Sequence, residues 1–431
     1  MPKTTKIKHP TDVITLGCRL NAYESAVMEG HARDNALDNT VIINSCAVTE
    51  EAVRSSRAAV RKAKRDRPDA RIIVTGCAAQ IDPQSFADMT EVDQVIGNQE
   101  KMLPATFDPD TLFSSEPIRV NDIMAVRETA PQLINGGNRA PEKSQSRTRA
   151  FLQVQNGCDH RCTFCIIPYG RGPARSVPAG EVVAHVKALV KQGYKEVVLT
   201  GVDLSSWGGD LPGQPPLGDL VTRVLKLVPD LPRLRLSSID PAEIDDRLFT
   251  ALTTEPRMTP YLHLSLQSGD TLTLKRMKRR HSREDALDLC TRLKSARQEI
   301  TFGADMIAGF PTEDDTMFEN SHTIISEIGI PWLHVFPYSP RAGTPAAKIP
   351  PVDGAITKQR ARALREEGAR IKAQHLDSRV GDTDLALFEE TGLGRLPDFT
   401  LVKLDTPPES GSLAKVQITG HDGNVATGHL I

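Results

Sequence analysis

The stretch FLQVQNGCDHRCTFCIIPYGRG, residues 151–172, places three cysteines, Cys158, Cys162 and Cys165, within eight consecutive positions. The apolar run in front of them is typical of a β-strand. In a reducing compartment, cysteines grouped in this way are more often metal ligands or catalytic groups than disulfide partners. The stretch therefore predicts a metal centre held by three thiolates, with no fourth cysteine beside them.

Zinc and an iron–sulfur cluster are the two centres that such a motif could hold. Closed zinc sites take four ligands, usually as two pairs, and the fourth ligand here would have to be His160, inside the first gap of the motif. Four-iron clusters are also normally held by four thiolates, so three thiolates leave one iron able to bind another molecule. The spacing favours the open cluster and leaves zinc as the alternative.

The composition of the 431 residues sets the context for this motif. A chain of this length is expected to form two or three domains. Its 39% hydrophobic and 25% charged residues are typical of a globular protein, and the net charge of -2 identifies no partner. The sequence has neither a secretory signal nor an apolar run of about 18 residues. We expect a cytoplasmic protein that is not bound to a membrane.

A second set of three cysteines lies in the first hundred residues, where apolar runs alternate with helical patterns. The runs are DVITLGC, TVIINSC and ARIIVTGC, and they end at Cys18, Cys46 and Cys77. Alternating strands and helices predict a parallel sheet, and the carboxyl ends of its strands meet at one edge. We expect these three thiols to share a site; unrelated small residues at strand ends are the alternative. The seventh cysteine, Cys290, stands alone in a helical pattern and is expected in the core.

The remaining pattern divides the chain into four segments. Residues 1–135 are expected to form a Rossmann-like parallel α/β domain, and residues 136–149, polar and rich in Gly, Ser and Arg, are expected to be a linker. Residues 150–375 contain six β-like runs separated by helices, which predicts a partial (β/α)6 barrel followed by one long basic helix. Residues 376–431 alternate apolar and polar positions and predict a small β-barrel.

The string CDHRCTFC, which is C-x3-C-x-aromatic-C on the loop after the first barrel strand, resembles the signature of the radical S-adenosylmethionine enzymes. The resemblance implies that Cys158, Cys162 and Cys165 hold a [4Fe-4S] cluster whose open iron chelates S-adenosylmethionine. An electron from that cluster then cleaves the cofactor to a 5′-deoxyadenosyl radical. In such enzymes the chemistry belongs to the cofactor, and the protein supplies placement and exclusion of water.

Four strings, TLGCRLNAYES, VIINSCAVTEEA, IVTGCAAQ and NGCDHRCTFCIIPYGRGPARS, followed by a terminal β-module, resemble the methylthiotransferases over essentially the whole chain. This family inserts a sulfur atom and a methyl group at an unactivated C–H bond. The resemblance implies that Cys18, Cys46 and Cys77 hold a second, auxiliary [4Fe-4S] cluster, whose open iron carries the sulfur. It also implies that the terminal module is a TRAM domain, a presumed RNA-binding unit.

Residues at the ends of the barrel strands are candidates for binding S-adenosylmethionine, by their position and by the same resemblance. A glycine lets a backbone approach closely, a carboxylate accepts from an ammonium, and an aromatic ring beside the last cysteine packs near the adenine. Loop caps and an ordinary buried aromatic are the alternatives. The candidates are Phe164, Gly201, Asp203, Ser265, Gln267, Gly309 and Glu313.

The strings GCRLNAYES, LTGVDLSSWG and LHVFPYSPRAGTPAA resemble the branch of the family that acts on N6-threonylcarbamoyladenosine, at C2, beside the tRNA anticodon. The resemblance therefore implies a tRNA substrate; the sulfur source and the electron donor are not identified by it. Isopentenyladenosine in tRNA and an aspartate of a ribosomal protein are the alternative substrates. A non-catalytic iron–sulfur sensor that binds RNA is the alternative of a different class. We expect a monomer.

An RNA substrate should leave an electrostatic footprint on the protein. Residues 52–67 carry seven basic residues and one acid in a helical pattern, and residues 275–283 form a second basic run. A solvated helix face is the alternative explanation for each. The last residues give no such support, since nine acids stand against four basic residues from Asp377 onward. The candidate phosphate contacts are Arg54, Arg57, Arg61, Arg65, Arg279 and Arg280.

Overall fold

The computed structural model describes residues 10–113, 116–127 and 148–431. The chain divides into two compact units. The first unit comprises residues 1–142 together with 156–160 and 165–175, and the second comprises residues 143–155, 161–164 and 176–431. Most of the linker expected at residues 136–149 lies outside the described residues, and Arg149 already belongs to a strand.

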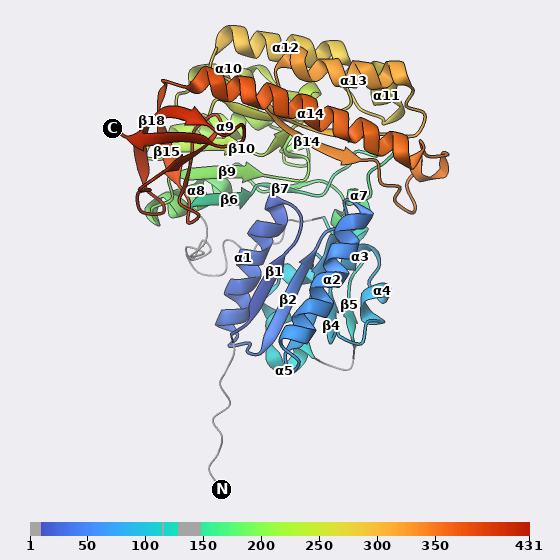
Figure 1. The fold of residues 1–431 in the computed structure, drawn as a ribbon. Coiled ribbons are helices and arrows are strands. Elements are labelled where there is room, and N and C mark those ends of the chain that lie inside the picture. The colour runs from blue at the N-terminus through green and yellow to red at the C-terminus, as the bar shows by residue number, and fades with distance from the viewer. Residues whose placement is uncertain (1–9, 114–115, 128–147) are drawn as a thin grey trace. The chain divides into compact units, whose positions relative to one another are not determined.

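The first unit contains a five-stranded sheet in which every neighbouring pair of strands is parallel (Figure 1). The strands follow one another across the sheet in chain order. They are β1 (Asp12–Thr15), β2 (Thr40–Ser45), β3 (Arg71–Gly76), β4 (Gln94–Ile96) and β5 (Ile118–Arg119). The parallel α/β domain expected from the sequence is confirmed, and β5 is a fifth strand that the sequence pattern did not predict.

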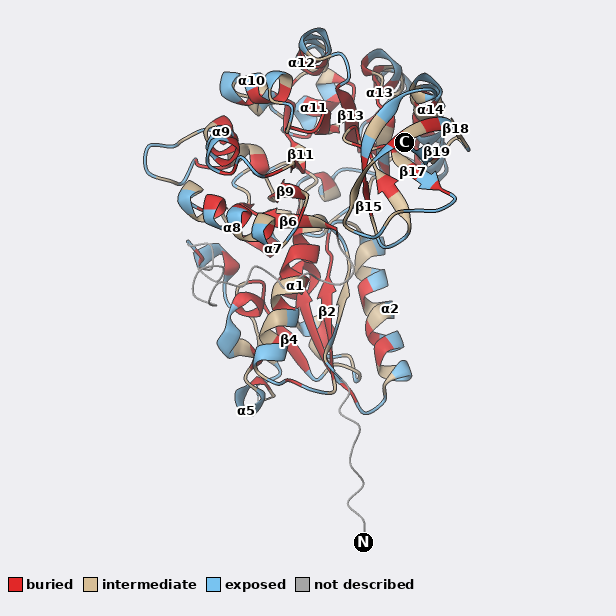
Figure 2. Cartoon of the chain, turned by 90° about the vertical axis from the view of Figure 1, so that its left-hand side faces the viewer, coloured by how far each residue is buried: buried red, intermediate tan, exposed pale blue. Residues whose placement is uncertain are grey.

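Helices cover both faces of this sheet, as the continuous apolar character of β2 and β3 requires. On one face the core includes Val60 and Ala63 of α2 (Glu50–Asp66). On the other it includes Met28 and Ala32 of α1 (Arg19–Asp34). Both central strands are buried along nearly their whole length, and β2 and β4 are coloured as buried in Figure 2.

Short elements complete the first unit. They are α3 (Cys77–Ile81), α4 (Gln84–Ala87), η1 (Glu100–Met102), η2 (Pro104–Phe107), α5 (Pro109–Leu112), η3 (Ile123–Ala125) and α7 (Ile167–Arg171). Helix α7 comes from the segment that follows the three-cysteine motif, and it packs against α3 and η3.

The second unit begins with the six parallel strands expected of a partial barrel. The third strand is interrupted at Ser237, so its halves, β10 and β11, pair in two separate sheets. The spatial order follows the chain, and each pairing is parallel. The strands are β6 (Arg149–Gln153), β9 (Glu196–Thr200), β10 (Arg233–Leu236) with β11 (Ser238–Ile239), β12 (Tyr261–Gln267), β13 (Thr301–Ala308) and β14 (Trp332–Pro337).

Helices separate these strands, as the sequence pattern predicted, and the short helix Thr271–Arg276 was not expected. They are α8 (Ala179–Lys191), α9 (Leu217–Leu227), α10 (Asp246–Thr254), α11 (Thr271–Arg276), α12 (Arg283–Ala296) and α13 (Asp315–Ile328). Two further short strands, β7 (Gln155–Asn156) and β8 (Arg175–Ser176), pair with each other. Cys290 of α12 is 2% exposed, which confirms its expected place in the core.

The long helix α14 runs over Gly354–Arg379, four residues past the boundary at 375 expected from the sequence. Its Leu376 belongs to the core of a closed five-stranded barrel, so the end of the helix is part of the terminal module. The barrel strands are β15 (Thr383–Phe388), β16 (Leu393–Arg395), β17 (Leu401–Leu404), β18 (Leu413–His421) and β19 (Ala426–Leu430). The expected small β-barrel is confirmed.

The terminal module is joined to the partial barrel by aromatic and ionic contacts. Phe399 stacks on Tyr261 of β12 with ring centroids 4.6 Å apart. Arg149 of β6 bonds Glu389 at 3.0 Å. The Arg235 guanidinium lies 5.3 Å from the centroid of the Phe399 ring and pairs with Glu196, and both side chains of that pair are fully buried. Among the described residues, no helix is both long and apolar enough to cross a membrane.

Candidate cluster-binding sites

The first three cysteines lie at the carboxyl edge of the sheet in the first unit. Cys46 directly follows β2, Cys77 is the first residue of α3 directly after β3, and Cys18 is the N-cap of α1. A Cβ on Gly17, the residue before Cys18, would come within 2.8 Å of Cys46 Sγ. The parallel topology therefore brings together thiols that are far apart in the sequence.

Two glycines permit the turns that lead into this edge. Gly17 and Gly76 both have φ of +95°, which side chains rarely adopt. A Cβ on Gly76 would also come within 2.3 Å of the carbonyl oxygen of Ser45, so the chain can enter Cys77 only without a side chain there. The turn glycines thus fix where Cys18 and Cys77 begin their helices.

The three thiols differ in exposure. Cys46 and Cys77 are 7% and 5% exposed, whereas Cys18 is exposed. Burial raises the pKa of Cys46 to about 11, and the nearby charges of Cys77 and Cys18 add to that shift. Cysteines bind metals as thiolates, so binding of a metal centre at these three residues releases protons. A site closed on one side and open at Cys18 fits a centre that must accept a further ligand.

A buried ionic network lies beside Cys77. The Arg171 side chain of α7 is 2% exposed, and its Nε donates a hydrogen bond to Cys77 Sγ at 3.0 Å. Its Nη atoms donate to Glu24 and Asn21 of α1. Lys101 of η1 donates to the same Glu24 carboxylate at 2.6 Å, and neither side chain of that pair is exposed.

This network carries more positive than negative charge. Burial acts to raise the pKa of Glu24, but the cations of Arg171 and Lys101 outweigh it and hold that pKa below its usual value. One carboxylate thus faces two buried cations, and an unbalanced buried charge is costly. A centre held by three thiolates supplies the missing negative charge. The donor set and its surroundings therefore fit a four-iron cluster with one open iron.

Close packing holds the segment 165–175 against this edge within the first unit. A Cβ on Gly170 would stand 3.3 Å from Cys77 Cβ. Asn98 Nδ2 donates to the Gly170 carbonyl at 2.5 Å, and the backbone nitrogen of Cys158 donates to the Gly172 carbonyl at 3.0 Å. Backbone contacts at Gly170 and Gly172, on either side of Arg171, hold its side chain beside Cys77.

The second set of cysteines lies on the loop between β7 and α7, and all three are half-buried. Within the second unit, Cys162 Sγ accepts from Arg279 Nη1 at 3.6 Å. The next residue, Thr163, is held from both sides: its nitrogen donates to the Met277 carbonyl at 3.1 Å, and its carbonyl accepts from Ala346 at 2.9 Å. Cys162 thus sits on an irregular but well-anchored segment.

Phe164 packs against a buried apolar cluster of the second unit that includes Met277, Ile307, Phe310 and Ala346. This place agrees with an ordinary partly buried aromatic, and a contact with adenine stays a prediction. On β9's carboxyl end, a Cβ on Gly201 would come within 2.8 Å of Gln155 Oε1, so the glycine accommodates that side chain.

The polar candidates at the strand ends have partners of their own. Asp203 accepts from Ser206 Oγ at 2.7 Å, and its nitrogen donates to Gln155 Oε1 at 2.9 Å. Ser265 and Gln267 are half-buried at the end of β12, where the ladder is irregular and Gln267 has φ of +69°. Non-glycine residues with positive φ cluster at ligand sites. Their roles in cofactor binding stay predictions.

The Glu313 carboxylate already has two hydrogen-bond partners within the protein. Its carboxylate accepts from the Gly309 nitrogen at 3.0 Å and from Arg360 of α14 at 2.9 Å, and its side chain is 1% exposed. Gly309 itself has φ of +73° and leaves no room for a Cβ beside Thr357. These contacts give Glu313 the role of fixing the loop after β13.

Of the arginines predicted to contact RNA, four lie on α2. Arg61 and Arg65 are exposed, and so is Arg54, which pairs with Glu51. Arg57 is half-buried, with its guanidinium 5.6 Å from the centroid of the Phe86 ring. Three of the four arginines predicted on this stripe are therefore exposed, and their contact with RNA stays a prediction.

The other two, Arg279 and Arg280, are tied to acids of the second unit. Arg279 is 9% exposed and donates to Asp240 at 3.0 Å and to the Ser265 carbonyl at 2.9 Å. Arg280 bonds both Asp240 and Glu243. Burial acts to raise the pKa of Asp240, but hydrogen bonding and the neighbouring cations lower it well below its usual range. Arg279 thus fills an internal position beside Cys162, although RNA contact by this pair remains untested.

Sequence reasoning did not single out Arg171, Glu24 or Lys101. One signal was available: Glu24 stands midway between Leu20 and Met28, four residues from each, on the buried stripe of α1. A carboxylate on an apolar stripe indicates a buried partner of opposite charge. The identity of that partner could not be found, because Arg171 is 147 positions away in the sequence.

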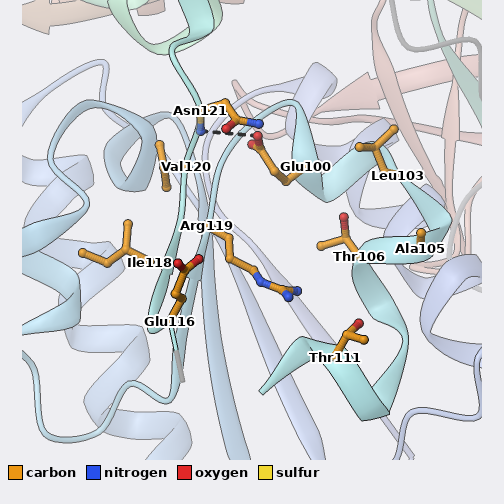
Figure 3. A pocket seen from close by; sticks show the side chains of 10 residues that line it. All are labelled: Glu100, Leu103, Ala105, Thr106, Thr111, Glu116, Ile118, Arg119, Val120 and Asn121. Carbon is orange, nitrogen blue, oxygen red and sulfur yellow. Dashed lines mark hydrogen bonds between the residues drawn. The ribbon is translucent and has the colours of Figure 1, made fainter. Parts of the chain in front are cut away.

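Two other polar features of the described residues lie outside these sites. In the second unit one Asp305 oxygen lies 3.1 Å from His263 Nε2 and 3.2 Å from His334 Nδ1. In the first unit a hollow of about 520 Å³ lies between β5 and the elements η1, η2 and α5 (Figure 3). Glu100, which lines this hollow, accepts a hydrogen bond from the Asn121 backbone nitrogen. None of the six cysteines in the two sets lines the hollow.

A partial barrel of parallel strands with a C-x3-C-x2-C loop after its first strand defines a radical S-adenosylmethionine enzyme. The model of the radical SAM superfamily matches residues 152–323, and that of the uncharacterized protein family UPF0004 matches residues 11–97. Among solved structures, the radical S-adenosylmethionine methyltransferase TsrM from Kitasatospora setae aligns with a TM-score of 0.52. It covers 76% of this chain and 67% of its own at 16% identity, which supports the fold alone.

Curated relatives extend over nearly the whole chain. The threonylcarbamoyladenosine tRNA methylthiotransferase MtaB of Rickettsia prowazekii is 48% identical over 95% of this chain and 94% of its own length. The protein of the same name from Bacillus subtilis is 34% identical over 85% and 82%. A tRNA-2-methylthio-N(6)-dimethylallyladenosine synthase from Erythrobacter litoralis is 31% identical over 100% and 98%. The chain belongs to the radical S-adenosylmethionine methylthiotransferase family.

Proposed function

We propose that this protein is a tRNA methylthiotransferase that adds a methylthio group at C2 of N6-threonylcarbamoyladenosine beside the anticodon. The observation that carries the proposal is the presence of two separate sets of three cysteines, each set with an arginine donating to one of its sulfurs. Relatives named for this substrate, at 48% and 34% identity over most of the chain, support the choice of nucleoside.

The two sets have different roles in the proposal. Cys158, Cys162 and Cys165 hold the cluster that binds S-adenosylmethionine, and Cys18, Cys46 and Cys77 hold the cluster that carries the sulfur. When bound, these groups supply one electron for cleavage of the cofactor and the sulfur atom for transfer. The chain's own residues bind and orient them and exclude water from the reacting atoms.

Several residues have defined supporting tasks. Arg279 orients the segment around Cys162, because its guanidinium connects Cys162, Asp240 and Ser265. Glu313 and Arg360 fix the loop after β13, where the family places a cofactor contact. Phe164, Gly201, Asp203, Ser265, Gln267 and Gly309 line the proposed binding site for S-adenosylmethionine.

The partners follow from the substrate. A tRNA substrate places the protein in the cytoplasm, and one chain carries both cysteine sets, so a monomer is sufficient for the reaction. Arg54, Arg61 and Arg65 are the exposed members of the proposed phosphate-binding stripe on α2, and Arg54 pairs with Glu51.

Mass spectrometry of nucleosides from tRNA of cells with and without this gene tests the proposal. We expect loss of the methylthio group from N6-threonylcarbamoyladenosine alone. Loss from isopentenyladenosine instead would favour the second candidate, which the relative from Erythrobacter litoralis supports. An unchanged tRNA profile would overturn the substrate and direct attention to the ribosomal protein aspartate. Purified protein that never cleaves S-adenosylmethionine would favour an iron–sulfur sensor.

A further inference from the structure

We propose that Arg171 is a positioning residue for the auxiliary cluster, and that its hydrogen bond to Cys77 Sγ raises the reduction potential of that cluster. This inference rests on the proposed role of Cys18, Cys46 and Cys77 as cluster ligands. It assigns a function to a residue that is not a proposed ligand and that lies on α7, six positions after Cys165.

The geometry of the contact is specific to arginine. The planar guanidinium makes three different contacts at once: Nε to Cys77 Sγ at 3.0 Å, and its Nη atoms to Glu24 and Asn21. A lysine at this position has one nitrogen and cannot reproduce this fork. Because the side chain is 2% exposed, water does not replace any of these partners.

The surroundings prevent the guanidinium from moving away from the sulfur. Gly170 packs closely on Cys77, and Asn98 donates to the Gly170 carbonyl. Glu24 is itself fixed by Lys101, which also reaches Asn44 Oδ1 at 3.2 Å. Asn21 in turn donates to the carbonyls of Leu16 and Ser45. Contacts of this kind around the ligands tune metal centres.

The direction of the effect follows from charge. Reduction adds an electron to the cluster and increases the negative charge on its thiolates. A hydrogen bond from a buried cation stabilises the reduced state more than the oxidised one, since the local dielectric constant is low. Hydrogen bonds to the sulfurs and net charge are known determinants of cluster potential. Removal of the Arg171 donor should therefore lower the potential.

The experiment uses the full chain with Cys158, Cys162 and Cys165 replaced by Ala, so that only the auxiliary cluster can be reconstituted. Its potential is measured by a redox titration followed by electron paramagnetic resonance. In this background R171Q removes the donor. E24Q/R171Q also removes it but keeps the net charge of the buried network, since one anion and one cation are lost together. R67Q is the matched control: this arginine of the first unit pairs with Asp12 and touches no thiol.

We expect the equilibrium constant for reduction to fall at least about tenfold in R171Q and E24Q/R171Q, which for one electron is about 59 mV. R67Q should leave it unchanged. R171K keeps the positive charge but cannot make the three contacts of the guanidinium, so its potential should lie between that of the parent, the triple alanine variant, and that of R171Q. If R171Q assembles no cluster, R171K is compared with the parent instead. Equal potentials in R171K, E24Q/R171Q and the parent would overturn the inference. A parent with no cluster would instead overturn the proposed function of the first three cysteines.

Discussion

The two cysteine sets bring three thiols together in different ways. Cys158, Cys162 and Cys165 are neighbours in the sequence and lie half-buried on an irregular loop. Cys46 and Cys77 are buried at the ends of adjacent parallel strands, and Cys18 lies exposed at the start of α1. The first arrangement needs only a short irregular segment, whereas the second needs a complete α/β sheet.

Under the proposed function, this difference fits the separate tasks of the two clusters. A loop can wrap a cluster whose open iron must remain accessible to a cofactor. Strand ends hold a cluster rigidly and bury two of its three ligands, which suits a centre that keeps a sulfur until the substrate is ready. In both sets, nevertheless, one sulfur accepts a hydrogen bond from an arginine far away in the sequence: Cys77 from Arg171 and Cys162 from Arg279.

The largest expected effect separates the two sets by chemistry. C162A should abolish reductive cleavage of S-adenosylmethionine, because it removes a ligand of the radical-generating cluster. C46A should keep most of that cleavage and lose methylthiolation of tRNA. The products are counted by mass spectrometry as 5′-deoxyadenosine and methylthiolated nucleoside.

C290A provides the control for this comparison, since Cys290 is a buried core residue of α12 and belongs to neither set. It should change neither product. Equal loss of cleavage in C162A and C46A would show that the two sets do not act separately.

The second prediction concerns the charge balance beside the auxiliary site. E24Q leaves Arg171 and Lys101 facing each other without their shared carboxylate. Removal of one partner from a buried ionic network typically costs about 3–5 kcal/mol. Hydrogen exchange of the amides in β2 and β3, measured on the apoprotein, should report a loss of that size in the free energy of opening.

E51Q is the matched control, because Glu51 pairs with Arg54 in the same unit and both side chains are largely exposed. Surface pairs contribute little, so the free energy of opening should change by less than about 1 kcal/mol. A small effect of E24Q on β2 and β3 would mean that the buried charges are balanced in some other way.

The sequence predicted where the two cysteine sets lie, but it did not predict the ion pairs beside them. Strand runs such as TVIINSC place Cys46 at the edge because the apolar pattern and the parallel topology are both readable from one chain. The same pattern placed Arg279 in a basic run predicted to contact RNA, whereas its side chain is 9% exposed and donates to Cys162. Charge runs reveal composition but not which side chain turns inward, because that depends on acids such as Asp240 located 39 positions away.

The partners of Arg171 show the same limit in the first unit. Its contacts with Glu24 and Cys77 span 147 and 94 positions. Local periodicity cannot encode pairs at that separation, which are set by the packing of α7 on α3. Sequence patterns therefore predicted the cluster ligands, and only the fold revealed the buried residues beside them.

The third prediction tests the buried ion pair of the second unit. Burial acts to raise the pKa of Glu196, but Arg235 outweighs it and lowers that pKa from 4.5 to about 2. A lowered pKa adds stability that is present above the unfolded value and lost as the pH falls. The wild type should therefore lose about 3 kcal/mol more than E196Q between pH 4.5 and pH 2.

Denaturant unfolding at each pH, followed by the fluorescence of Trp207 and Trp332, reports on this unit, since both tryptophans belong to it. E390Q, at an exposed position of the terminal module, should leave the pH dependence as in the wild type. Parallel curves for the wild type and E196Q would show that Arg235 does not hold the carboxylate ionised.

The smallest expected effect compares the surfaces of the two units. R61A/R65A removes two exposed cations from α2, whereas R223A/K226A removes two from α9 of the second unit. Each lost phosphate contact should reduce the slope of log affinity against log salt by roughly 0.9. We expect the α2 variant to bind tRNA more weakly with a slope reduced by roughly two, measured by fluorescence anisotropy. The α9 variant should bind as the wild type does. If both variants lose affinity equally, tRNA is attracted by overall charge, and α2 is a solvated face with no special part in recognition.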